Sequence, residues 1–156
     1  MEQKTKIHAE EGRHDLTITR EFDLPVDLLF RAHTEAEFVA QWMDNTVNKL
    51  EARKHGGYEI QKTGPDGTLY FKAHGVFHDV IPNEKIVRTF EMLNAPFETT
   101  LEFMTFENLG EDRSRLTMNV IYRSGELRDA NLKLPFAYGI NMAHDRLEEI
   151  AQKMMG

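Results

Sequence analysis

Hydrophobic and polar residues alternate with a period of two through most of the chain, and this pattern predicts β-strands. The segment 15–22 is the first: Leu16, Ile18 and Phe22 fall on one face, and Arg20 lies among them. The same pattern predicts six further strands at 46–53, 58–62, 69–80, 85–92, 97–107 and 115–122. Turn residues such as Gly64-Pro65-Asp66-Gly67 separate them, which predicts antiparallel hairpins.

Two other regions have the helical period of three to four residues. Val26, Leu29 and Phe30 share one face and predict a short helix over 26–32, and Thr34 followed by Glu37 forms a capping-box pattern for a second short helix through Trp42. Apolar residues then recur every three or four positions over 136–154. They predict one amphipathic C-terminal helix, about 30 Å long, preceded by a helical turn or two over 126–133.

These elements predict an α+β fold: a curved antiparallel sheet of about seven strands wrapped around the long C-terminal helix, with two short helices after the first strand. An antiparallel sheet has an apolar face that another element must cover, and only the C-terminal helix is long enough to do so. We expect a single domain over 15–155 and a flexible N-terminus over 1–14. A sheet curled around one helix also leaves room for a cavity between them.

Composition narrows the possible functions. The chain has 156 residues, 40% of them hydrophobic, and its formal net charge is -7. This charge opposes binding to nucleic acids and to anionic membrane surfaces. The chain contains no Cys, which excludes disulfides, thiolate nucleophiles and Cys-based metal sites. No apolar segment has the length for membrane insertion or a secretory signal, so we expect a cytoplasmic protein. The sequence indicates no oligomeric state.

The histidines do not form a metal motif. His74 and His78 share a strand face, but four residues separate them by about 13 Å, too far to bind one zinc ion. We therefore expect no metal and no cofactor. His144 lies beside the apolar stripe of the C-terminal helix, where it could act as a general acid–base or bind a carbonyl. The alternative, which we favour, is a boundary histidine whose ring packs while its nitrogens meet water or backbone.

The inward phase of the strands and of the long helix defines candidate cavity walls. Met118, Val120 and Tyr122 form one wall, and residues of the C-terminal helix form the other. The ligand-binding candidates are the aromatic and aliphatic side chains expected on these faces, with one histidine: Trp42, Phe71, Phe77, Phe90, Phe103, Met118, Val120, Tyr122, Phe136, Ile140 and His144. No residue is assigned a catalytic role.

Short motifs in order from about residue 16 to residue 150 resemble the START-like (SRPBCC) superfamily. They are 18–25, 40–42, Gly56-Gly57-Tyr58, Asp66-Gly67, 75–80, 82–86, 115–117, 128–130 and Gly139 with 145–147. The chain is most similar to the activator-of-heat-shock-protein-90-ATPase homologue (AHSA-like) group, often classed with polyketide cyclases and dehydrases. The resemblance implies the helix-grip fold. Residues 43–45, Ala52, Ile140 and His144 depart from the family pattern near the expected cavity mouth and helix wall.

Three functions follow as hypotheses. The first is a module that binds a small apolar or amphipathic molecule between sheet and helix. The second is a cyclase- or dehydrase-type enzyme in which His144, Tyr122 or Tyr138 moves a proton. The third is a chaperone-cofactor role through surface contacts, which the family name suggests. The sequence lacks a converging acid–base pair, which favours binding. Arg20 could anchor a ligand carboxylate, pair with an internal Asp or Glu, or reach solvent at the sheet edge, and its recurrence in the family resemblance favours the ion pair.

Overall fold

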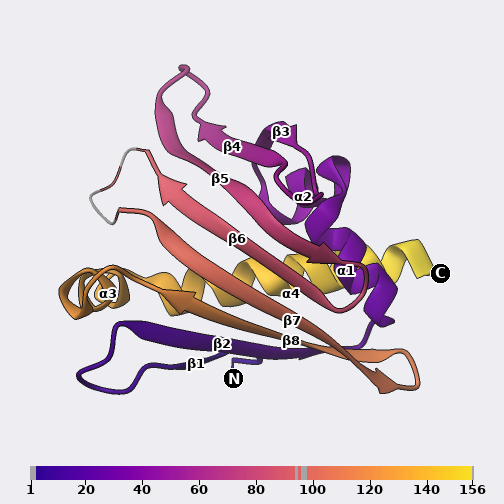
Figure 1. Ribbon diagram of the computed structural model, residues 1–156. Coiled ribbons are helices and arrows are strands. Elements are labelled where there is room, and N and C mark those ends of the chain that lie inside the picture. The colour runs from indigo at the N-terminus through magenta and orange to yellow at the C-terminus, as the bar shows by residue number, and fades with distance from the viewer. Residues whose placement is uncertain (1–2, 94, 96–97, 156) are drawn as a thin grey trace.

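The computed structural model describes residues 3–93, 95 and 98–155 and shows one antiparallel sheet of eight strands with four helices (Figure 1). The strands are β1 Lys6–His8, β2 Asp15–Phe22, β3 Thr46–Leu50, β4 Gly57–Thr63, β5 Leu69–Ile81, β6 Lys85–Met92, β7 Thr100–Gly110 and β8 Arg113–Ile121. The helices are α1 Val26–Thr34, α2 Ala36–Met43, α3 Gly125–Leu132 and α4 Phe136–Met155. The spatial order of the strands is β1-β2-β8-β7-β6-β5-β4-β3.

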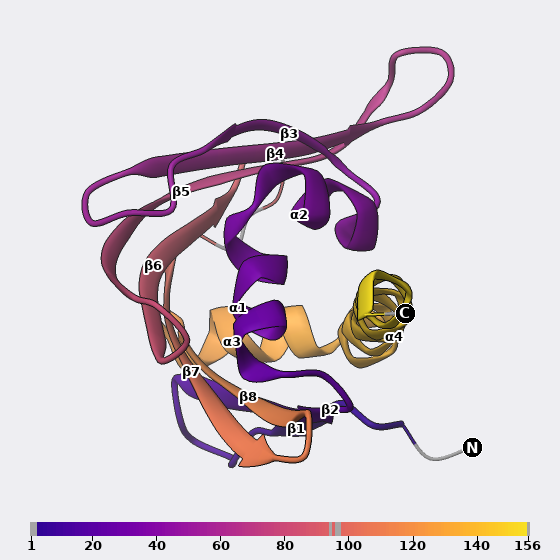
Figure 2. The same cartoon turned by 90° about the vertical axis from the view of Figure 1, so that its right-hand side faces the viewer.

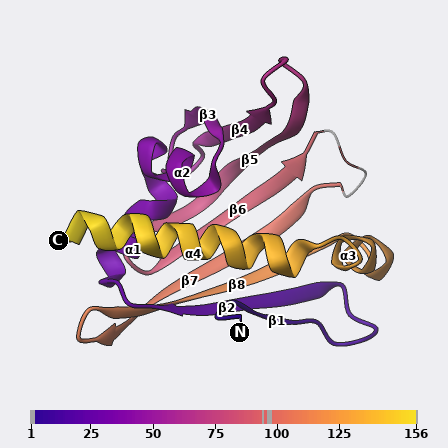
Figure 3. The ribbon, with the colours of Figure 1, turned by 180° about the vertical axis from the view of Figure 1, so that it is seen from behind.

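The sheet is strongly curved, and the long helix lies across its open side. Viewed along α4, the strands form an open C with α1 and α2 inside it and α4 at the mouth (Figure 2). From behind, α4 runs across the concave face from α3 toward α1 (Figure 3). The predicted helix-grip arrangement is confirmed, including the two short helices after the first long strand.

The end of the concave face beneath α1 forms a closed core. The strand register places Ile18 beside Met118, Met118 beside Met104, and Met104 beside Ile86. All four side chains are buried, and Phe30 of α1 packs edge-on against Phe106 of β7, with 5.0 Å between the ring centroids. This cluster supplies the large apolar burial that a domain of this size requires.

The eighth strand corrects the expected strand count. Strand β1 pairs with β2 through Ile7 and Ile18, inside the segment expected to be a flexible N-terminus, and Thr5 just before it is buried. A strand of three residues with a single apolar position is too short to show a period of two. The pairing of β1 with β2 and the contacts of Thr5 with α4 join residues far apart in the sequence, and they cannot be inferred from local sequence.

Several predicted boundaries also differ from the observed ones, and two of these differences concern the start of an element. Helix α2 is preceded by Glu35, not Thr34, because Thr34 ends α1 and its Oγ1 donates to the Phe30 carbonyl at 3.2 Å. The expected capping box is therefore wrong. The strand expected from Phe97 is observed from Thr100, and Phe97 itself lies outside the described residues.

No helix in the described ranges combines the length and hydrophobicity that crossing a lipid bilayer requires.

Candidate functional site

The predicted ligand-binding residues fall into three groups. Six are buried: Trp42, Phe77, Met118, Val120, Tyr122 and His144. Four are half-buried and lie on the concave face toward α3: Phe71, Phe90, Phe136 and Ile140. Phe103 lies with neither group. Met118, Val120, Tyr122, Phe136 and Ile140 thus have the inward orientation that the sequence pattern predicts.

Phe103 points away from the interior, and its assignment to the ligand site is a correction. Its side chain is 39% exposed, whereas its neighbours Glu102 and Met104 on β7 are buried. The strand carries apolar residues on both faces, and its inward face includes a glutamate, so hydrophobicity alone selects the wrong phase.

The interior is closed at one end and partly open at the other. Beneath α1, the side chains of Ile18, Met118, Met104 and Ile86 are almost inaccessible to solvent. Toward α3, Phe90 and Met92 of β6 keep partial exposure although they face inward, and the same holds for Ile140 of α4 opposite them. Inward apolar side chains that solvent can reach occur at this end of the sheet, beside the first half of α4.

Two open hollows lie elsewhere on the molecule. One, of about 360 Å³, is lined by the N-terminal segment, β2 and Arg115. The other, of about 380 Å³, is lined by residues 13–15 with Asn119 and Ile121. None of the predicted ligand-binding residues lines either hollow, so neither is the expected cavity between sheet and helix.

A charged pair lies on the concave face at the boundary between the two ends. Arg88 Nε donates to Glu102 Oε1 at 2.7 Å, and the Arg88 guanidinium lies 5.0 Å from the centre of the Tyr58 ring. The register places Phe77, Arg88, Glu102 and Val120 side by side across four strands. Only 16% of the Arg88 side chain and 9% of the Glu102 side chain are exposed.

The expected apolar wall residues do not include this pair. The strand pattern nevertheless contains a signal for it: Arg88 shares its strand phase with Ile86 and Phe90, and Glu102 shares its phase with Met104. Opposite charges at inward positions of adjacent strands indicate a buried ion pair.

Tyr122, which directly follows β8, is buried beside α3. Its hydroxyl accepts a hydrogen bond from Asn131 Nδ2 of α3 at 2.6 Å. Burial raises the pKa of Tyr122; the Asn131 hydrogen bond lowers it, and Glu102 raises it further. Burial likewise raises the pKa of Tyr58. Both phenols are therefore neutral at physiological pH.

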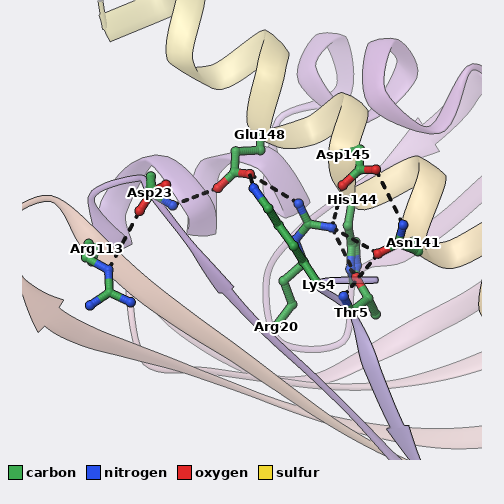
Figure 4. A network of polar contacts seen from close by, with 9 residues as sticks. All are labelled: Lys4, Thr5, Arg20, Asp23, Arg113, Asn141, His144, Asp145 and Glu148. Carbon is green, nitrogen blue, oxygen red and sulfur yellow. Dashed lines mark hydrogen bonds and ion pairs between the residues drawn. The ribbon is translucent and has the colours of Figure 1, made fainter. Parts of the chain in front are cut away.

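Arg20 forms a separate network that attaches the N-terminal strands to α4 (Figure 4). Its Nη1 donates to Asp145 Oδ1 at 2.8 Å and its Nη2 to Glu148 Oε1 at 3.1 Å. Glu148 Oε2 also accepts from the Asp23 backbone N–H at 2.7 Å. The internal ion pair predicted for Arg20 is confirmed. Because its side chain is fully enclosed and already paired with carboxylates, Arg20 is unsuited to anchoring a ligand.

His144 belongs to this network and is a packed histidine. Its Nδ1 lies 2.9 Å from Thr5 Oγ1, and its ring meets the Phe22 ring edge-on with 5.5 Å between the centroids. Burial lowers the pKa of His144 to about 3, with smaller contributions from His33 and Arg20. The ring packs as we favoured, but its partner is a side chain and not water or backbone.

Metal ligands do not converge anywhere in the part of the chain that the structure describes: no three His, Asp or Glu side chains are grouped as a metal site requires.

Most of the chain matches the model of a known protein family. The family model described as "Activator of Hsp90 ATPase homolog 1-like protein" matches residues 23–152. No protein with a curated description matches the sequence.

Solved structures show the same fold. Protein Ms6760 from Mycobacterium smegmatis superposes with a TM-score of 0.82 at 19% identity, covering 94% of this chain and 95% of its own. A protein from Rhodobacter sphaeroides gives a TM-score of 0.83 at 21% identity, with coverages of 95% and 99%. One from Arthrobacter aurescens gives 0.83 at 18% identity, with coverages of 95% and 91%. The fold agrees with the family match, and the chain belongs to the Activator of Hsp90 ATPase homolog 1-like family within the START-like superfamily.

Proposed function

We propose that the protein binds a small hydrophobic or amphipathic molecule between the sheet and the first half of α4. Membership of the family supports a ligand-binding or cofactor-like domain. The observation that supports this site is the half-burial of inward apolar residues at the α3 end, namely Phe71, Phe90, Phe136 and Ile140. Each 100 Å² of apolar surface that a ligand removes from water contributes roughly 2.5 kcal/mol, which favours occupation.

The placement of the three candidate proton carriers weighs against the cyclase or dehydrase alternative. His144 is enclosed beside Thr5, and its lowered pKa keeps it neutral. Tyr138 is 60% exposed, and the Tyr122 hydroxyl is bonded to Asn131. A general acid–base must reach the substrate with a pKa near the working pH. These groups are better suited to shaping a binding site than to moving a proton.

Titration with Nile red, a neutral apolar fluorophore, tests the proposal. The wild-type protein should bind the dye with increased fluorescence. The variant Ile140→Trp places an indole in the proposed space and should abolish binding with little change in melting temperature. Met142→Trp is the matched control, because Met142 lies on the same helix with 42% exposure, and it should bind the dye as the wild type does.

A solid core would give the opposite pattern. The wild type would not bind the dye, and Ile140→Trp would lose about 1–3 kcal/mol of stability through overpacking. If the protein instead stimulates the ATPase of the Hsp90 chaperone, equally in wild type and Ile140→Trp, and binds no dye, the chaperone-cofactor hypothesis takes the place of the ligand-binding one.

A further inference from the structure

The Arg88–Glu102 pair has hydrogen-bonding groups left over. Of the atoms in the pair, Arg88 Nε and Glu102 Oε1 bond to each other. The two Arg88 Nη groups and Glu102 Oε2 have no hydrogen-bond partner among the described residues. Arg20 Nε is the sole fully enclosed side-chain nitrogen or oxygen without a partner in that same part of the chain. The Nη groups and Oε2 therefore reach accessible space.

The burial of the flanking residues favours the half-open end of the concave face as this accessible space. Toward α3, Arg88 is followed on the same face of β6 by Phe90 and Met92, which are half-buried. Glu102 is preceded on the same face of β7 by Thr100, which is buried. On the other side of the pair, Ile86 and Met104 are sealed beneath α1. The free donors and the free acceptor thus lie at the inner end of the apolar walls assigned to the proposed ligand.

The local charge decides which head groups fit there. Arg88 and Glu102 cancel, and burial lowers the pKa of nearby His33 to about 4, which keeps that ring neutral. Tyr58 and Tyr122 are neutral for the reasons given above. A ligand carboxylate would add an unpaired negative charge beside Glu102, and a ligand ammonium would add an unpaired positive charge beside Arg88. An uncompensated ion at a buried site is strongly disfavoured.

We propose that the ligand has a neutral head group that both accepts and donates hydrogen bonds, such as an alcohol or a primary amide. Its oxygen accepts from the Arg88 Nη groups, and its O–H or N–H donates to Glu102 Oε2. The hydrocarbon part then lies along Phe90 and toward Phe136 and Ile140. This inference rests on the proposed function and specifies the chemical class that the same site takes.

Displacement of Nile red by three compounds of equal chain length tests it: decanol, decanoate and decylamine at pH 7.5, where the last two are ionised. The wild type should bind decanol at least about tenfold more tightly than either ion, because each ion brings an unpaired charge into the buried site. Glu102→Gln keeps the bond to Arg88 Nε but leaves the arginine charge unbalanced, so it should reverse the order and prefer decanoate over decanol.

Glu107→Gln is the matched control. Glu107 lies on the same strand, bonds to Arg115 on the outer face and is 43% exposed, so the wild-type preference should persist. Equal or tighter binding of decanoate by the wild type would overturn the inference without need of any variant. So would an unchanged preference for decanol in folded Glu102→Gln. Failure of Nile red and all three compounds to bind the wild type would instead refute the ligand-binding function itself.

Discussion

Arg20 and Arg88, two arginines on the concave side of the sheet, are neutralised in different ways. Arg20 has carboxylates from Asp145 and Glu148 on its two Nη groups, and the whole side chain is enclosed. Arg88 meets one carboxylate through Nε alone. Removing one member of a buried ion pair leaves the other charge unpaired. The Arg20 network thus has a structural role, whereas Arg88 retains donors for a ligand.

The buried His144 and His33 predict that the protein loses stability in acid. The pKa of His144 is lowered to about 3 and that of His33 to about 4, both primarily by burial, from the usual 6.5. The unfolded chain therefore takes up protons first as the pH falls. The stabilisation is complete above about pH 6.5 and decreases below it, by about 2 kcal/mol per histidine between pH 6.5 and pH 5.

Urea denaturation between pH 7.5 and pH 5 measures this effect. His144→Asn removes one titrating group, so the decline of unfolding free energy below pH 6.5 should fall to about half of its wild-type slope. The same change at His78, which is exposed, should leave the slope intact. Equal slopes in wild type and His144→Asn would show that His144 titrates alike in both states.

At the scale of single elements, β5 is adapted to the side chains that cross it. Tyr58 of β4 pairs with Gly75, and its hydroxyl donates to the Thr89 carbonyl of β6 at 2.6 Å. A Cβ on Gly75 would meet the Thr89 carbonyl oxygen, and it would lie 2.7 Å from atoms of the Tyr58 ring. Only glycine lets Tyr58 cover β5 and support the Arg88 guanidinium.

Two Gly→Ala variants test this close approach. Gly75→Ala should destabilise the protein by about 1–3 kcal/mol, because Tyr58 and the β6 backbone must shift. Gly139→Ala adds a methyl group to α4 at a position with no neighbouring atom of the described residues within 4 Å, apart from the helix's own backbone, and it should stabilise by about 0.5–1 kcal/mol through helix propensity. Chemical denaturation measures both. An unchanged free energy of unfolding in Gly75→Ala would mean that Tyr58 can move aside without loss of packing.

Periodicity predicted most elements, because each long strand and helix carries its own pattern. The bounds of β2 and β6 agree with those expected for 15–22 and 85–92. Long-range contacts were not predictable: β1 is held through Ile7 and Thr5 by distant partners. Polar residues inside the sheet were missed for a related reason. The stability of Glu102 at an inward position depends on Arg88, fourteen residues earlier on the neighbouring strand.

At the scale of the whole molecule, the interior divides into a sealed part and an accessible part. Helix α1 seals one end, and the Arg20 network fixes α4 against the N-terminal strands. Residues 136–140 at the start of α4 precede that attachment, and Ile140 is half-buried there. The degree of opening depends on how the sheet curvature and α4 fit together, which the residue pattern of each element alone does not specify. The proposed ligand occupies this accessible part.

The most direct test is NMR of the methionine methyl groups during titration with decanol, because methionines occupy both parts of the interior. Met92 lies at the accessible end, Met104 is sealed beneath α1, and Met155 is exposed at the end of α4. Binding at the accessible end predicts a saturable shift of the Met92 methyl signal, which is lost in Ile140→Trp, while the Met104 and Met155 signals stay unchanged. Saturable shifts at Met155 with an unchanged Met92 signal would place the binding site elsewhere and contradict the proposed site.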